Sequence, residues 1–330
     1  MPKSVALGVD IGGTKVAAGL VDLDGTVLFR ARAPMVAAGD AAAGFTAVKS
    51  AIDAVLAASP SSREGLEGIG VCAPGPLDPS TGIVINPPNL PCWRNFPLAA
   101  KVKSAYGVDA RIDNDANAAG LAEALWGAGV GYQNVFYATV GTGIGTGIVF
   151  GQRVYHGRTG SAAEGGHLSI DYRGPQCACG KRGCVEVFCS APAIAQRARS
   201  KLAEATRSPS RISELAEGDL ARITAEQVGE AFRAGDALAA EVLRETADLF
   251  TVWLGNVIDL LEPDVIVIGG GAAELIVSFF DRIRKQLPQW STNPRCGEIP
   301  LVNAKYGTDA GIAGAAALLS VNRKRGVSAP

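Results

Sequence analysis

The feature that most constrains this chain is a pattern that occurs twice: a short β-rich run, a turn of Gly and Thr, and a second β-rich run. The first copy spans residues 5–22 and contains DIGGTK, and the second spans residues 134–150 and contains GTGIGTG. Glycine lets backbone N–H groups approach an anion, and threonine adds a hydroxyl donor. Two such turns would suit a ligand held between two related domains, although an ordinary tight hairpin also explains either turn alone.

Three kinds of phosphate-binding structure could explain these two turns. A Walker A loop needs the spacing GxxxxGK[ST] before a helix, and the chain has no such spacing. A dinucleotide-binding fingerprint also leads into a helix, whereas both turns here lead into β-rich runs, at residues 16–21 and 144–150. We therefore expect β-hairpins that wrap phosphates. Asp10 would hold a water bound to Mg²⁺, since this ion keeps several waters in proteins.

A third glycine cluster, Gly269 to Gly271, follows an apolar run at residues 265–268. Residues without a Cβ would let a flat adenosine lie on the backbone. Close packing of a helix on a strand explains the same glycines equally well, so both interpretations stay open.

The composition places the chain among globular α/β proteins. Its 330 residues are enough for two domains that each bury a core. Apolar residues make up 48% and charged residues 19%, which excludes a disordered chain, and the net charge of −1 argues against a dedicated nucleic-acid binder. We expect strands at 5–9, 16–22, 26–31, 69–72, 110–112, 134–140, 144–150, 265–268 and 300–303. We expect helices after DNDAN to about 126, at 42–58, across 191–261 apart from a polar loop at 207–218, from about 272, and at 309–320.

A membrane or secreted location is not expected. The most apolar region, residues 249–269, is interrupted by Asp259, Glu262 and Asp264, so it does not form a membrane span. The first residues lack the apolar stretch of a signal peptide, and seven cysteines are an odd number for a disulfide framework. We therefore expect a cytoplasmic protein with reduced cysteines.

A cluster of three cysteines and one histidine has a specific spacing. His167 is followed by Cys177, Cys179 and Cys184, so three thiolates and an imidazole fall within 18 residues. Such a set suits a tetrahedral zinc ion, and Gly180 allows a sharp turn inside it. Because the protein would fill all four positions, we expect a structural zinc that orders the loop. Reduced structural thiols or a redox pair are the alternatives.

The run DNDAN at residues 113–117 lies where a strand is expected to end and a helix to begin. Asn114 is placed to cap that helix, and Asp115 lies in its first turn, where the helix dipole keeps a carboxylate ionised. An ionised carboxylate at the end of a strand suits a general base for a hydroxyl group.

Three further polar residues, Glu164, His167 and Glu186, flank the cysteine cluster on both sides. A metal that orders this segment would fix their side chains as hydrogen-bonding groups, as the recognition of a polyol requires. Taken singly, the two glutamates are equally typical of a solvated surface.

These motifs, in this order, resemble the ROK family, which joins bacterial sugar kinases and sugar-responsive repressors. The resemblance covers nearly the whole chain and implies a two-domain α/β fold of the ribonuclease H-like type found in actin and hexokinase. The smaller N-terminal domain would span 1–117, joined by a C-terminal helix at about 308–330, and the larger domain would span 118–307 and carry the zinc loop. The motifs are DIGGTK (10–15), APGPLD (73–78), NLPCW (89–93), DNDANAAGLAEALWGAG (113–129), GTGIGTGI (141–148), AEGGH (163–167), CACGKRGCVE (177–186) and VIGGG (267–271).

The resemblance also implies a reaction: ATP-dependent phosphorylation of a hexose at its 6-hydroxyl, with glucose as the expected substrate and Asp115 as the catalytic base. N-acetylglucosamine, N-acetylmannosamine, mannose and fructose are the alternative substrates. The implied sugar ligands are Gly75, Asn89, Asn114, Asp115, Glu164, His167 and Glu186. The implied contacts of ATP and Mg²⁺ are Asp10, Gly12, Gly13, Thr14, Lys15, Thr142, Gly143, Gly270 and Gly271.

Two positions depart from the pattern of the family. Cys92 and Ala163 stand where members commonly have glycine, and both lie beside positions expected to face the sugar, so they bear on which hexose is accepted. Repressors of the family carry a helix-turn-helix before the DxGGT motif, which begins here at Asp10. We therefore expect an enzyme rather than a DNA-binding regulator. The resemblance also implies a homodimer, the common form of the family. A zinc-knuckle binding module is a third possibility, which would have no use for Asp115.

Overall fold

The computed structural model describes residues 4–59, 64–204 and 210–320. The chain folds into two compact units, and each is described by itself. The first unit consists of Met1–Tyr137, Gly147–Ala163 and Ala304–Pro330, and the second of Ala138–Thr146 and Glu164–Asn303.

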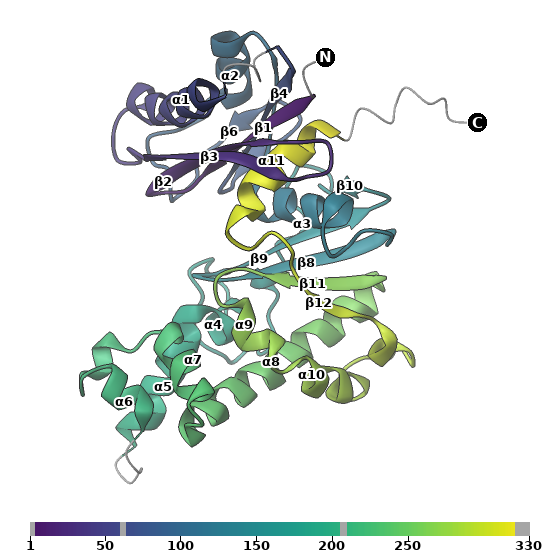
Figure 1. Ribbon diagram of the computed structural model, residues 1–330. Helices are drawn as coiled ribbons and strands as arrows, with labels where there is room; N and C mark the ends of the chain where they lie inside the picture. Colours follow the sequence, from purple (N-terminus) through teal and green to yellow (C-terminus); the bar gives the residue numbers. More distant parts are fainter. Residues whose placement is uncertain (1–3, 60–63, 205–209, 321–330) are drawn as a thin grey trace. The chain divides into compact units, whose positions relative to one another are not determined.

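The first unit contains a five-stranded sheet with the order β3-β2-β1-β4-β7 (Figure 1). β1, β2 and β3 pair antiparallel in succession, whereas β1, β4 and β7 run parallel. The carboxyl ends of these three parallel strands therefore meet at one edge of the sheet. The strands are β1 (Val5–Ile11), β2 (Lys15–Val21), β3 (Val27–Pro34), β4 (Leu66–Ala73) and β7 (Asp109–Asn114), and a small hairpin adds β5 (Leu77–Asp78) and β6 (Ile83–Val84).

Helices cover both faces of this sheet. The apolar side chains of α1 (Ala41–Ala58) and α2 (Leu98–Tyr106) share a core with those of β1 and β4 on one face. On the other face, α11 (Ala310–Ser320) packs on β1 and β4, with α3 (Asp115–Trp126) beside it (Figure 1). Glycine permits the close approach of α11, because a Cβ at Gly8 would lie 1.9 Å from the carbonyl oxygen of Ile312.

The helix α1 is also long and apolar enough, by length and composition alone, to cross a membrane. Its buried residues, among them Val48, Ile52 and Val55, belong to the core of the first unit. Packing on the sheet therefore accounts for its apolar composition.

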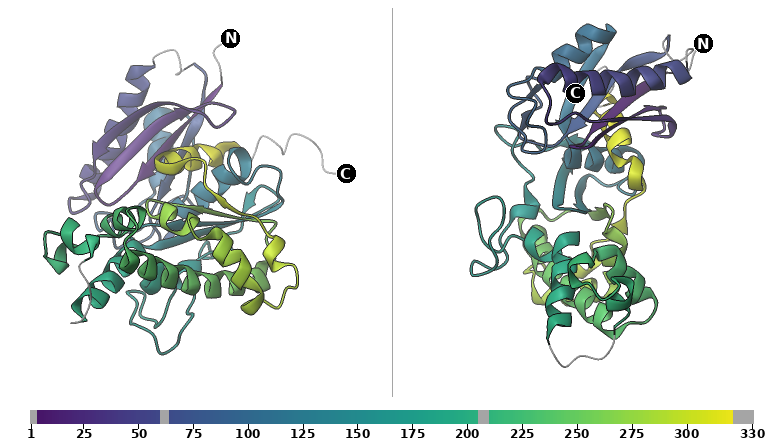
Figure 2. Two further views of the ribbon diagram at one scale, coloured as in Figure 1. Left: turned by 60° about the horizontal axis from the view of Figure 1, so that its bottom comes forward. Right: turned by 90° about the vertical axis from the view of Figure 1, so that its left-hand side faces the viewer.

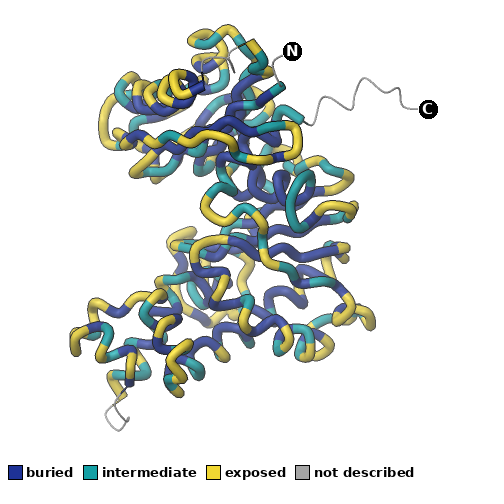
Figure 3. Tube along the Cα trace, in the orientation of Figure 1, coloured by how far each residue is buried: buried dark blue, intermediate teal, exposed yellow. Residues whose placement is uncertain are grey.

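A second five-stranded sheet has the order β10-β9-β8-β11-β12, and the division between the units runs through β8 and β9. Strands β11 and β12 pair parallel, and β9 and β10 antiparallel. The central strands β4, β8 and β11 are largely buried, whereas the edge strand β3 is mostly exposed, so the tube in Figure 3 is dark blue through the middle of each sheet. The strands are β8 (Asn134–Val140), β9 (Ile144–Phe150), β10 (Arg153–Val154), β11 (Val265–Gly269) and β12 (Leu301–Asn303).

Helices of the second unit gather around the long helix α8 (Ala237–Leu261), as Figures 1 and 2 show. α8 buries Phe250 and Trp253, whose rings pack edge to face with centroids 4.9 Å apart. The other helices are α4 (Glu186–Cys189), α5 (Ala191–Ala203), α6 (Arg211–Leu215), α7 (Ala225–Arg233), α9 (Ala273–Val277) and α10 (Phe280–Gln286). Short 3₁₀ helices in the chain span Gly165–His167, Leu220–Arg222, Leu287–Gln289, Cys296–Glu298 and Gly307–Asp309.

The predicted strands are confirmed with bounds that differ by at most three residues. The polar loop predicted at 207–218 is wrong in part, because α6 lies within it; residues 205–209 lie outside the described part of the chain. Ser210 caps α6 and Ile212 anchors it in the core, a short signal that the polar composition hid. Of the C-terminal helix predicted to about 330, the part after Ser320 lies outside the described residues.

The predicted boundary after residue 117 differs from the division into compact units, which places all of α3 in the first unit. α3 packs against α11, and these contacts place both helices in the same compact unit. The boundary at 117 remains a prediction about the domains themselves.

Candidate functional site

The parallel strands of the first unit bring three polar side chains into one row. In the register of the sheet, Asp10 at the end of β1 lies beside Cys72 of β4, which lies beside Asp113 of β7. Asp115 follows one residue after β7 ends and begins α3. The topology therefore gathers three acids, far apart in the sequence, at one edge of the sheet.

Asn114 caps α3, as predicted: its Oδ1 accepts hydrogen bonds from the backbone N–H groups of Ala116 at 2.9 Å and Asn117 at 3.2 Å. Its amide nitrogen lies near Gly75, where a Cβ would be 4.0 Å away. With the oxygen engaged by the helix, the amide N–H groups are the part of Asn114 that can serve a ligand.

Asp115 combines solvent access with a raised pKa. The residue has an exposed surface, yet loss of hydration against the surrounding protein raises the pKa of its carboxyl to about 6, and the charge of Asp10 adds to this rise. A hydrogen bond from the backbone N–H of Ala116, at 2.8 Å, acts in the opposite direction. A carboxylate with one open side and protein on its other sides explains both observations. Such a group is ionised at neutral pH and can accept a proton there.

Asp10 is held from two sides. The thiol of Cys72 donates to its Oδ1 at 3.5 Å, and α11 closes on it so tightly that a Cβ at Gly311 would lie 2.4 Å from its Cγ. Burial raises the pKa of Asp10, while the Cys72 thiol and the charge of Lys15 lower it. The carboxylate is therefore fixed in place at the start of the DIGGTK turn.

The DIGGTK turn is a β-hairpin, which confirms the prediction of a strand rather than a helix after it. β1 and β2 pair antiparallel up to Ile11 and Val16, and the N–H of Gly12 donates to the carbonyl of Lys15 at 2.9 Å. A Cβ at Gly13 would lie 3.0 Å from the carbonyl oxygen of Asn89, which places that predicted sugar ligand beside the hairpin. Thr14 and Lys15 are exposed.

The GTGIGTG turn joins β8 and β9 and supports the AEGGH segment of the second unit. The N–H of Gly165 donates to Oγ1 of Thr146 at 2.8 Å, and a Cβ at Gly166 would lie 1.8 Å from the carbonyl oxygen of Ile144. The indole of Trp253 donates to the carbonyl of Gly165 at 2.9 Å. These contacts fix the backbone from which Glu164 and His167 extend.

Glu186 has a role that the sequence did not predict. Its Oε2 accepts a hydrogen bond from the backbone N–H of Ile144 at 3.0 Å, and a Cβ at Gly143 would lie 2.5 Å from the same oxygen. One carboxylate oxygen thus supports the GTGIGTG turn, beside the exposed Thr142. No spacing could reveal this contact, because the partners are 42 residues apart.

The glycines after β11 have separate explanations. Gly270 has φ +97°, and a Cβ there would lie 2.4 Å from the carbonyl oxygen of Val140, so close packing explains it. A Cβ at Gly271 would meet nothing within 4 Å. Gly271 therefore leaves open space beside the turn, where a flat ligand could approach.

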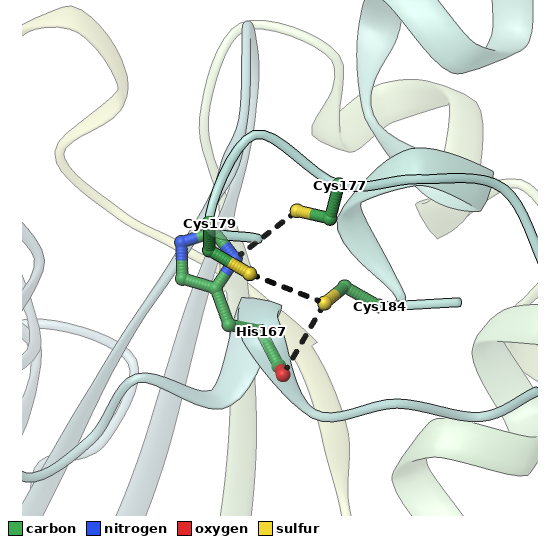
Figure 4. Close-up of side chains that lie close together, drawn as sticks. All are labelled: His167, Cys177, Cys179 and Cys184. Carbon is green, nitrogen blue, oxygen red and sulfur yellow. Dashed lines mark hydrogen bonds between the residues drawn. The ribbon is translucent and has the colours of Figure 1, made fainter. Parts of the chain in front are cut away.

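The predicted zinc ligands converge (Figure 4). The donor atoms of His167, Cys177, Cys179 and Cys184 all lie within 4.8 Å of one another. The Cys179 and Cys184 sulfurs are 3.7 Å apart, and the Cys177 sulfur is 3.6 Å from Nδ1 of His167. A tetrahedral zinc ion with ordinary bond lengths would place two sulfurs about 3.8 Å apart and a sulfur and a nitrogen about 3.6 Å apart. The cluster therefore fits zinc in donor type and in spacing.

The histidine of this cluster is oriented for two partners. Nδ1 faces Cys177, and the other ring nitrogen points away from the three sulfurs (Figure 4). Oε1 of Glu186 lies 3.9 Å from Nδ1. Metal binding through Nδ1 would leave Nε2 available to a ligand, which agrees with the two roles predicted for His167.

The predicted residues divide between the two units. The first unit holds Asp10, Gly12, Gly13, Thr14, Lys15, Gly75, Asn89, Asn114 and Asp115, and the second holds Thr142, Gly143, Glu164, His167, Cys177, Cys179, Cys184, Glu186, Gly270 and Gly271. All seven cysteines are unpaired thiols, as expected.

Comparison with known proteins identifies a family that matches this chain. The sequence profile of the ROK family matches residues 6–322. The glucokinase of Thermotoga maritima is 33% identical over 97% of this chain and 98% of its own, and the glucokinase of Streptomyces coelicolor is 32% identical over 95% and 97%. Among solved structures, a ROK family glucokinase from Streptomyces griseus in complex with glucose and AMPPNP superposes with a TM-score of 0.77, at 33% identity over 96% of this chain and 99% of that one.

Proposed function

The chain belongs to the ROK family, and we propose that it is a hexose kinase that transfers the γ-phosphoryl group of ATP to the 6-hydroxyl of glucose. The observation that carries the proposal is Asp115, an accessible carboxylate with a pKa near 6 at the edge where three parallel strands end. The glucokinases that resemble the chain over almost their full length support it. The strand order β3-β2-β1-β4-β7, with an antiparallel hairpin and then parallel strands, supports a ribonuclease H-like fold.

In this mechanism, Asp115 accepts the proton of the sugar hydroxyl as that oxygen attacks the γ-phosphorus. The raised pKa suits the task, because a base works best when its pKa lies near the working pH. Asn114 and Glu164 would orient the sugar through hydrogen bonds, the first through its amide N–H groups. The sugar hydroxyls need such partners because buried polar groups without them are costly.

The phosphates would be held by the two glycine-rich turns. The DIGGTK hairpin offers backbone N–H groups, the hydroxyl of Thr14 and the ammonium group of Lys15, and the GTGIGTG turn offers Thr142 and Gly143. Mg²⁺ bound with ATP would neutralise charge on the phosphates. Asp10, which is fixed by Cys72 and α11, would hold one of the waters bound to this Mg²⁺.

Zinc would have a structural part. His167 and the three cysteines would hold the ion, and their ligation would close the loop between Ser169 and Cys184, which already pair as an isolated bridge. Closing this loop would fix His167 and the helix that begins with Glu186. The metal would then stabilise the sugar-binding residues without contact with the reacting atoms.

The proposal is tested by the release of ADP in a coupled assay with glucose, mannose, fructose, N-acetylglucosamine and N-acetylmannosamine. We expect the highest kcat/KM for glucose, with glucose 6-phosphate as the product identified by NMR. A preference for another of these sugars would reassign the substrate within the hexose kinases. Absence of sugar-dependent ADP release with all five would refute the proposed activity.

A further inference from the structure

One pair of charged side chains next to the proposed base has no part in the mechanism above. The carboxylate of Asp113 is 3% exposed, and its Oδ2 lies 2.6 Å from Nε2 of His156. Its Oδ1 accepts from the backbone N–H of Asn114 at 2.7 Å and from the amide of Asn117 at 3.2 Å. One buried carboxylate thus joins the end of β7, the first turn of α3 and the segment after β10.

His156 is reachable from solvent, whereas its partner is not. The imidazole is 35% exposed and lines a cavity of about 820 Å³ beside β7, within the first unit. The hydrogen bond with Asp113 raises the pKa of His156, and partial burial opposes the rise. His156 therefore tends to carry a proton, and its Nε2–H donates to a carboxylate that has lost nearly all contact with water.

The pair lies within an acidic environment. Burial and the charges of Asp10, Asp115 and Asp113 together hold the pKa of the Cys72 thiol well above its ordinary value, which shows that all three acids act on one point. A buried carboxylate without a partner is strongly destabilising, and three negative groups so close would repel one another. Other charged groups line the cavities that His156 borders: Asp78, Asp109, Arg111, Arg153 and Arg158. Arg111 also donates to the carbonyl of Leu318 at 3.0 Å.

We propose that His156 is a positioning residue for the base: it holds Asp113, and through Asp113 it fixes the turn from which Asp115 reaches the substrate. This inference rests on the proposed function. Loss of the imidazole leaves Asp113 buried with an unmatched charge, so the carboxylate must take up a proton or turn toward the cavity. Either change weakens its bonds to Asn114 and Asn117, which set the start of α3.

Two substitutions at His156 separate the effect of its hydrogen bond to Asp113 from the effect of its positive charge. His156→Ala removes both, and we expect kcat to fall roughly 10- to 100-fold, the effect of a small displacement of a catalytic group, with the KM for ATP nearly unchanged. His156→Gln keeps a hydrogen-bond donor without the charge, so it should recover most of kcat.

A second pair of variants tests whether His156 acts through Asp113. In the Asp113→Asn background the buried charge is gone, so adding His156→Ala should reduce kcat much less than it does in the wild type. The control is Arg282→Ala, which breaks the bidentate ion pair with Asp248 in the second unit, at 2.7 and 2.9 Å, and should leave kcat and the pH profile unchanged.

The imidazole also gives a readout that does not depend on turnover. NMR titration of the zinc-bound protein should show His156 with a pKa above its ordinary value, and Asp113→Asn should lower it. Unchanged kcat in His156→Ala, or a lower melting temperature alone, would overturn the positioning role while wild-type turnover upholds the kinase. If His156→Ala fails to fold, the same criteria apply to His156→Phe, which keeps the bulk of the ring without the hydrogen-bond donor. A wild-type protein inactive with every hexose would instead overturn the proposed function and this role with it.

Discussion

Oε2 of Glu186 accepts a hydrogen bond from the backbone N–H of Ile144, and this bond connects the helix that follows Cys184 to the GTGIGTG turn. The other carboxylate oxygen, Oε1, lies 3.9 Å from Nδ1 of His167. One side chain therefore faces both the turn proposed to hold phosphate and the histidine proposed to hold zinc. The conformations of these two segments should respond to each other.

Gly143→Ala tests this connection. The new methyl group would lie 2.5 Å from Oε2 of Glu186, so the carboxylate must move and lose its bond to Ile144. We expect the KM for ATP and that for the hexose both to rise several-fold, measured by initial rates. Gly141→Ala is the matched control, since a Cβ there would meet nothing within 4 Å. Equal kinetics for the two variants would contradict the proposed coupling.

Metal removal should act on recognition more than on the chemical step. Elemental analysis of protein purified without added zinc should find about one zinc per chain, and Cys179→Ser should lose it, because structural zinc sites need all four ligands. Without the metal the loop carrying His167 is released, so the sugar KM should rise strongly and the melting temperature should fall. Cys296→Ser, at a buried thiol outside the cluster, is the control for the loss of a cysteine alone and should keep its zinc. A metal-free Cys179→Ser that binds sugar as well as the wild type would contradict this role.

Ala163 occupies a backbone conformation that glycine adopts more easily. Its φ is +66°, in the left-handed region, where a Cβ costs roughly 1–2 kcal/mol. Replacing it with glycine removes this strain but adds unfolded-state entropy of about 0.5–1 kcal/mol. We expect Ala163→Gly to raise the free energy of unfolding by up to about 1.5 kcal/mol, measured by urea denaturation.

The neighbouring residue provides the comparison for that variant. Ala162 is not one of the described residues with a positive φ. Ala162→Gly therefore relieves no strain and should lower the free energy of unfolding by about 0.5–1 kcal/mol. If both variants change the free energy of unfolding in the same direction, backbone strain at Ala163 does not determine the effect of its substitution. The departure from glycine at Ala163 was visible in the sequence, but its backbone conformation was not.

Local patterns were sufficient to predict most elements and the cluster of one histidine and three cysteines. The β-rich runs around DIGGTK and GTGIGTG, the cap at Asn114 and the spacing of the cysteines all act over a few residues. The bonds from Ile144 to Glu186 and from His156 to Asp113 cross 42 and 43 residues, and only the path of the chain brings these partners together. α6 was missed for a related reason: its anchor, Ile212, is a single buried residue in a polar segment.

Asp115 gives the sharpest test, because its raised pKa predicts opposite pH trends for activity and stability. As the pH rises through about 6 the carboxylate loses its proton and becomes a base, so kcat should rise to a plateau. Over the window from about 4 to 6 the native state binds more protons than the unfolded state, so this group's contribution to stability should fall as the pH rises. Asp115→Asn should lower kcat about 10²- to 10⁴-fold. It should also abolish the rise of kcat with pH and the fall of stability with pH, since the amide does not titrate. Asn114 still caps α3 in this variant and the neutral amide lacks the charge that burial penalises, so the melting temperature at neutral pH should not fall and should rise. Near-normal kcat with a clearly lowered melting temperature would instead make Asp115 a structural residue and leave the proposed reaction without its base.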